Sequence, residues 1–180
     1  MTYYDEIYEH AADNFGLITA SEARAIGVSN VDLVKIAGRG KLRRVVYGVY
    51  RLTHYVPTDF DQYAEAVAIV GTGSFIFGQS VLAMFGLAFV NPRTIAVATS
   101  ARVRKKLPPY IKIVPAKGDI EVTKYDGIPI QSVADAFRTC RTTVMTERLL
   151  PAIEEARRQA LVTEREAKAL TKEIKRCKKA

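Results

Sequence analysis

The sequence contains no tryptophan and, among its 180 residues, only two cysteines and two histidines. Cys140 and Cys177 form no CxxC pair, so the chain has no framework for a structural zinc site or a disulfide-stabilised scaffold. Glycine and proline occur at ordinary frequency, 11 and 7 residues, which excludes fibrous and low-complexity classes. Because 48% of the residues are hydrophobic, we expect a folded chain with a buried core.

We also expect no secretion signal at the N-terminus, since the segment MTYYDEIYEH begins with acids and has no apolar core. Residues 66–92 carry no charge and are long enough to cross a bilayer. Gly71 and Gly73 interrupt this stretch, however, and polar residues lie in its middle, which favours two core-facing helices separated by a break. We therefore expect no membrane partner and, with unpaired cysteines, a cytoplasmic location.

Three helices are predicted within the first 40 residues. A stripe of apolar residues predicts the first over residues 1–14. Thr19 with Glu22 three residues later is a capping box, which starts the second helix. Ser29 starts the third, which runs to about residue 37, and the short connection between these two favours a helix-turn-helix.

The next segment is rich in β-branched and aromatic residues. Runs 41–46 and 49–52 are typical of strands, and Tyr47-Gly48 between them is typical of a hairpin turn. A helix, a helix-turn-helix and a hairpin in this order predict a winged helix-turn-helix domain over residues 1–57.

Residues 58–180 are expected to form a second domain of mixed composition, which makes the fold class α+β. The helices predicted in it cover residues 60–70, 78–85, 132–140, 146–159 and 163–177. The strands predicted in it cover residues 94–99, 111–114, 120–123 and 128–130.

The net charge of +8 is unevenly distributed. Residues 1–28 hold one base and five acids, whereas residues 29–51 hold six bases and one acid. The basic stretch coincides with the third helix and the hairpin, the parts that a winged helix-turn-helix places against DNA. We therefore predict that double-stranded DNA is the partner of this domain.

The expected DNA-binding residues divide into base-reading and phosphate-binding groups. Asn30 can pair with adenine through two hydrogen bonds, and an outward Val31 or Val34 can contact a thymine methyl group. The lysine and arginine side chains are expected to contact backbone phosphates, or to enter the minor groove from the wing. The full set is Ser29, Asn30, Val31, Val34, Lys35, Arg39, Lys41, Arg43 and Arg44.

Two further basic regions have a less specific meaning. A second basic cluster consists of Arg102, Arg104, Lys105 and Lys106. It is either a phosphate- or partner-binding loop or a solvated loop beside a strand. Residues 141–180 carry 11 bases and six acids, a pattern that favours exposed amphipathic helices first and a contact surface second.

Catalytic patterns are weak throughout the chain. His10 and His54 have no neighbouring nucleophile in a recognisable arrangement. Asp119, Glu121 and Asp126 bracket predicted strands, where a metal-dependent nuclease can place its acids, and we keep a nuclease as the less favoured alternative. We expect no catalytic residues, no metal and no cofactor.

Four segments resemble the AbiEi-type antitoxins of bacterial type IV toxin–antitoxin systems. The most similar are GLITASEARAIGVS at residues 16–29 and GKLRRVVYGVY at residues 40–50. Looser similarity continues through QSVLAMFGL at residues 79–87 and GIPIQSVADAF at residues 127–137. The chain departs from that family at Val34 and Gly38, where relatives commonly have bases, and at Asp135, which replaces a basic residue.

The resemblance implies an N-terminal winged helix-turn-helix that represses its own operon by binding inverted repeats in the promoter. It also implies that the second domain opposes a nucleotidyltransferase-like toxin without forming a stable complex with it. A winged-helix transcriptional regulator with no toxin partner is the alternative.

Overall fold

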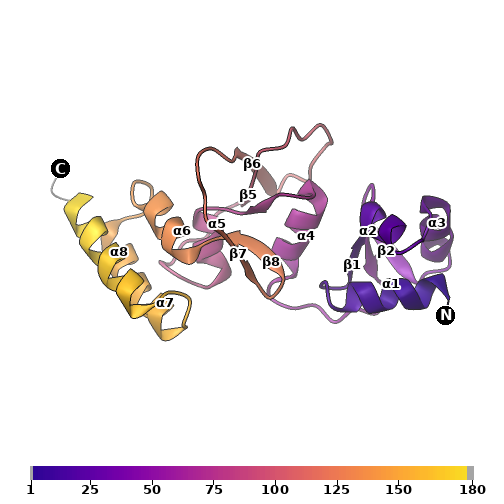
Figure 1. The fold of residues 1–180 in the computed structure, drawn as a ribbon, viewed down its shortest axis with the longest axis horizontal. Coiled ribbons are helices and arrows are strands. Elements are labelled where there is room, and N and C mark those ends of the chain that lie inside the picture. The colour runs from indigo at the N-terminus through magenta and orange to yellow at the C-terminus, as the bar shows by residue number, and fades with distance from the viewer. Residues whose placement is uncertain (1, 178–180) are drawn as a thin grey trace. The chain divides into compact units, whose positions relative to one another are not determined.

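The computed structural model describes residues 2–177, over which the chain forms eight helices and eight strands. The fold class is therefore α+β, as the sequence predicts. The chain divides into two compact units, Met1–Thr72 and Gly73–Ala180, and each contains one sheet (Figure 1).

The first unit follows the order expected from the sequence, with one additional strand. Its elements are α1 (Tyr3–Ala12), β1 (Leu17–Thr19), α2 (Ala20–Ala25), α3 (Asn30–Gly38), β2 (Leu42–Val46), β3 (Val49–Leu52) and α4 (Asp61–Val70). The capping box of α2 is confirmed, since Thr19 Oγ1 accepts from the Glu22 amide at 3.2 Å and the Glu22 carboxylate accepts from the Thr19 amide at 2.8 Å. The unpredicted strand is β1.

The three strands form an antiparallel sheet in the order β1-β3-β2, so that β3 is central and β2 lies at an edge. The hairpin between β2 and β3 turns at Gly48, whose φ of +79° is a left-handed conformation that favours glycine. One side of the sheet faces a continuous apolar core. Its fully or nearly fully buried side chains include Ile7, Ala11, Ile18, Ala23, Val28, Leu33, Ile36, Leu42, Tyr50 and Leu52.

The boundary between the units lies after α4, not near Pro57 where the sequence places it. The physical reason is an ion-pair cluster that ties α4 to the sheet. The guanidinium of Arg51 on β3 lies 3.2 Å from the Asp61 carboxylate and 3.4 Å from that of Glu65. Because both acids belong to α4, which also contacts β1, this helix stays with the first unit.

Tyr55 packs against the backbone of Gly16 within the same unit. Gly16 has a φ of +68°, and a Cβ atom added there would lie 2.5 Å from Cγ of the Tyr55 ring. The Tyr55 hydroxyl donates a hydrogen bond to Asp61 Oδ1 at 3.2 Å. Burial of the phenol, and then the nearby Asp61 charge, raise the pKa of Tyr55. Glycine is thus required at position 16 by both conformation and space.

The second unit contains a mixed five-stranded sheet in the order β6-β5-β4-β8-β7. Its strands are β4 (Phe75–Ile76), β5 (Ile95–Thr99), β6 (Ile111–Pro115), β7 (Val122–Tyr125) and β8 (Ile128–Gln131). Its helices are α5 (Gln79–Met84), α6 (Val133–Cys140), α7 (Thr146–Arg158) and α8 (Glu164–Cys177). Helix α5 packs on α6, and α7 and α8 lie side by side (Figure 1).

Asp135 lies at the start of α6, where it forms contacts that stabilise the fold. Its amide donates to the capping hydroxyl of Ser132, and its carboxylate accepts from Arg138 at 2.8 Å. Arg138 also donates to Glu173 of α8 at 2.9 Å, so that Asp135 and Glu173 together hold one guanidinium. The acid at position 135 therefore helps to attach α6 to α8.

Within residues 2–177, no helix has the length and apolar character needed to cross a membrane. The uncharged stretch 66–92 is divided among the end of α4, β4, α5 and their loops, with the break that its glycines predict. Lys178 and Lys179, the last bases of the C-terminal tail, lie outside the described residues.

Gly16→Ala should destabilise the first unit more than Gly27→Ala. Both glycines have positive φ, but nothing lies within 4 Å of an added Cβ at Gly27. Backbone strain should therefore cost about 1 kcal/mol at both positions, while the contact with Tyr55 should add about 1–3 kcal/mol at Gly16 alone. Urea unfolding measures the difference, and equal losses in the two variants would contradict the packing of Tyr55 on Gly16.

Candidate nucleic-acid interface

Helix α3 presents a row of exposed side chains because its other face is buried. Leu33 and Ile36 lie one helical turn apart and belong to the core, so the residues on the opposite side of the helix face solvent. Val31 and Val34 are 62% and 59% exposed. Asn30 and Lys35 are exposed beside them, so the arrangement expected from the sequence is present in this helix.

The start of α3 is fixed by Ser29. Its hydroxyl accepts from the Asp32 amide at 3.2 Å and donates to the Asp32 carboxylate at 2.6 Å. Ser29 thus serves as the N-cap and positions the exposed first turn. The only acid on this helix, Asp32, is held by this bond and lies 3.8 Å from the Lys35 ammonium.

The two arginines of β2 are both exposed but lie on opposite faces of the hairpin. Arg43 is paired across the strands with Arg51, and Arg44 with Tyr50, whose side chain is buried in the core. Because side chains of directly paired residues share a face, Arg44 lies on the core side of the sheet, where α3 packs, and Arg43 on the other. Arg44 is therefore better placed than Arg43 to extend the exposed surface of α3.

The tip of the hairpin carries a residue that the sequence interpretation did not select. Tyr47 is 85% exposed, and the Arg44 guanidinium lies 5.1 Å from its ring centroid. Two-residue hairpin turns are usually built from Asn, Asp and Gly. An aromatic residue at this turn is therefore unusual, and it is the feature of the sequence that points to Tyr47 as a candidate contact residue. Arg44 and Tyr47 together form an amphipathic tip with a cation and a hydroxyl.

Arg51 does not belong to this surface, although it is one of the six bases between residues 29 and 51. Its side chain is only 12% exposed and is held by the two carboxylates of α4. Five exposed bases remain, and they are Lys35, Arg39, Lys41, Arg43 and Arg44. The local charge asymmetry therefore persists after the buried arginine is removed.

The second basic cluster lies in the second unit, in the loop between β5 and β6. Arg102, Arg104, Lys105 and Lys106 are all exposed there. No ion pair involving these four occurs within the described part of the chain. The loop thus presents uncompensated positive charge, which both a phosphate-binding and a solvated loop would show.

The three acids considered for a nuclease site do not converge. Asp119 and Glu121 precede β7, whereas Asp126 follows it, so the four-residue strand separates them by about 13 Å along its length. Across residues 2–177, no group of three or more His, Cys, Asp or Glu side chains is arranged to hold a metal ion.

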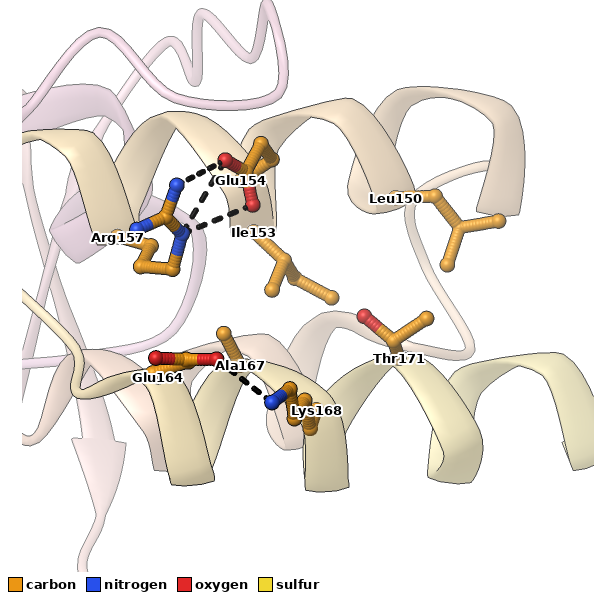
Figure 2. A pocket seen from close by; sticks show the side chains of 8 residues that line it. All are labelled: Leu150, Ile153, Glu154, Arg157, Glu164, Ala167, Lys168 and Thr171. Carbon is orange, nitrogen blue, oxygen red and sulfur yellow. Dashed lines mark hydrogen bonds and ion pairs between the residues drawn. The ribbon is translucent and has the colours of Figure 1, made fainter.

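The antiparallel pair α7–α8 encloses an amphipathic groove of about 460 Å³ (Figure 2). Its lining residues are Leu150, Ile153, Glu154, Arg157, Glu164, Ala167, Lys168 and Thr171. The charged groups at its rim pair along their own helices, Arg157 with Glu154 at 2.6 Å and Lys168 with Glu164 at 2.6 Å. Hydrogen bonding to Arg157 lowers the pKa of Glu154, as bonding to Lys168 does for Glu164. The groove therefore has little uncompensated charge.

Comparison with protein-family models gives no match, and comparison with curated proteins gives none either. Among solved structures, the chain is similar to the RV2827C protein from Mycobacterium tuberculosis, with 12% identical residues and a TM-score of 0.48. The alignment covers 94% of this chain and 71% of that protein. A likeness at this level assigns neither an activity nor a partner.

The different environments of Arg51 and Arg43 predict different effects of the same substitution. Arg51→Gln removes one partner of a nearly buried ion cluster and should lower the free energy of unfolding by about 3 kcal/mol. Arg43→Gln, directly opposite on β2, should change it by less than about 0.5 kcal/mol because that side chain is exposed. Urea unfolding of both variants measures this, and equal stabilities would show that Arg51 has no structural role.

Proposed function

We propose that the first unit is a winged helix-turn-helix that binds double-stranded DNA. In this proposal α2 and α3 form the helix-turn-helix, α3 enters the major groove, and the β2–β3 hairpin is the wing. The observation that supports it most is the exposed row of Asn30, Val31 and Val34 on a capped helix, bordered by exposed bases. The side chains of this row can contact the edges of DNA bases, and the basic side chains beside it can bind phosphates.

The chemistry of each position suggests its part in binding. The Asn30 amide can donate to and accept from the edge of an adenine, while the valine methyl groups suit a thymine methyl. Lys35 adds a cation to the same face. Arg44 and Tyr47 at the wing tip can bind a phosphate or enter the minor groove, since arginine is favoured in narrow minor grooves.

We further propose that this DNA-binding protein is an autorepressor and antitoxin of a type IV toxin–antitoxin operon. The support is the similarity of residues 16–29, 40–50, 79–87 and 127–137 to AbiEi-type antitoxins. An inverted repeat requires two copies of the unit, one on each half-site. The proposed toxin is a nucleotidyltransferase-like enzyme, opposed by the second unit without a stable complex.

Substitutions of a phosphate-binding and of a base-reading residue should weaken DNA binding in two distinguishable ways. Neutralising about four to six phosphates gives a slope of log K against log salt concentration of about −4 to −5. Arg44→Gln should reduce that slope by about 1 and weaken binding to every sequence. Asn30→Ala should leave the slope unchanged and weaken binding only to the promoter DNA upstream of the gene, by about 1–3 kcal/mol.

Fluorescence anisotropy with the promoter duplex and a scrambled duplex of equal length measures both effects. Lys112→Gln, which removes an exposed charge from β6, is the control for a general loss of charge. If Asn30→Ala and Arg44→Gln both bound like the unchanged protein, the assignment of α3 and the wing would be wrong.

The antitoxin role predicts rescue of growth that does not require base reading. Co-expression of the full chain with a nucleotidyltransferase-like protein encoded beside it should relieve the toxicity of that protein. Asn30→Ala should rescue equally well when both genes are under an unrelated promoter, because repression is then bypassed. DNA binding without any rescue would favour the alternative, a transcriptional regulator with no toxin partner.

A further inference from the structure

A groove of about 480 Å³ lies between the first turn of α1 and the side of α3 that runs from Asp32 to the C-cap residue Arg39. Its lining residues are Thr2, Tyr3, Tyr4, Asp32, Lys35, Ile36, Arg39 and Lys41. Asp32, Lys35, Ile36 and Arg39 recur at the spacing of one helix face, so a single stripe of α3 forms one wall. Tyr3 and Tyr4 form the opposite wall, and Lys41 closes the end where β2 begins.

The groove has uncompensated positive charge. Three cations line it against the single acid Asp32, which is bonded to Ser29 and lies 3.8 Å from Lys35. Among the residues that the structure describes, Arg39 and Lys41 have no acidic partner. Lys41 instead lies 5.3 Å from the ring centroid of Tyr4. The groove between α7 and α8 is of similar volume, but its bases are paired with acids (Figure 2). Of the two, only the α1–α3 groove has the charge to attract an anion.

The position of the groove relates it to the proposed base-reading face. Lys35 follows Val31 by four residues and precedes Arg39 by four, so it belongs to the border between that face and the groove. Successive helix positions are about 100° apart, so Arg39 lies about 80° around the helix axis from Val31 and about 40° from Lys35, on the flank of the exposed face near the other end of the helix. A duplex whose major groove held Val31 would bring the backbone on its Lys35 side toward Arg39.

We propose that the α1–α3 groove binds a phosphate of the DNA backbone next to the base pairs read by α3. This inference rests on the proposed DNA-binding function. Arg39 and Lys41 supply the charge, and the exposed hydroxyl of Tyr3 can donate a hydrogen bond to the phosphate oxygen. By holding a phosphate, the groove fixes how α3 is rotated about its own axis on the duplex. A single basic side chain on the surface does not fix this rotation.

The test compares Arg39→Gln, Lys41→Gln and the charge-matched control Lys112→Gln in the full chain. The probe is a duplex of mixed sequence, titrated by fluorescence anisotropy at several salt concentrations. Arg39→Gln and Lys41→Gln should each reduce the salt slope by about 1 and weaken binding roughly five- to tenfold at 0.1 M salt. Arg39→Lys should restore the slope because it keeps the charge, and thermal unfolding should be unchanged for Arg39→Gln.

Three results would overturn the proposal, and they are distinguishable. Unchanged slopes for Arg39→Gln and Lys41→Gln, with weaker promoter binding by Asn30→Ala, would leave the DNA-binding function intact and show that the groove is not in contact with DNA. Absence of salt-dependent DNA binding by the unchanged protein would overturn both proposals. Binding of free ADP that Arg39→Gln abolishes, with no change in slope, would assign the groove to a mononucleotide instead.

Discussion

Burial of Leu33 and Ile36 determines which surface the first unit presents. These side chains hold α3 against the sheet, and the period of the helix then directs Asn30, Val31 and Val34 outward. The same packing fixes the stripe that forms one wall of the α1–α3 groove. The proposed base-reading and phosphate-binding positions are therefore consequences of one apolar contact, and a rotation of α3 would move both sets together.

The sheet and α4 determine which basic side chains of the first unit are buried and which are exposed. Arg51 is taken into contact with Asp61 and Glu65, so it stabilises the unit and leaves the exposed bases on α3, β2 and their connection. The sequence shows six bases in one stretch but not which of them is buried, because the partners of Arg51 lie in a later helix. It also groups Arg43 with Arg44, which the pleat of β2 separates onto opposite faces.

Most elements can be predicted from local signals, and the exceptions have a common cause. Helices with caps, such as α2 and α3, and strands with β-branched runs appear where the sequence indicates. Strands β1 and β4 have no local signal in the sequence because they have only three and two residues and their pairing partners are distant in sequence. The division between the units lies after α4 for the same reason, since nonlocal ion pairs hold this helix to the first sheet. Local sequence patterns predict the individual helices and strands. Contacts between residues that are distant in sequence decide which of these elements belong to the same unit.

The most direct test of the proposed DNA surface on α3 and the β2–β3 hairpin is residue-resolved NMR of the full chain with and without promoter DNA. We expect the amide signals that shift to belong mainly to residues 29–48 and to the first turn of α1. Signals from the β5–β6 loop and from α7 and α8 should move far less. Shifts concentrated in those segments of the second unit, with α3 unchanged, would contradict the proposed DNA surface.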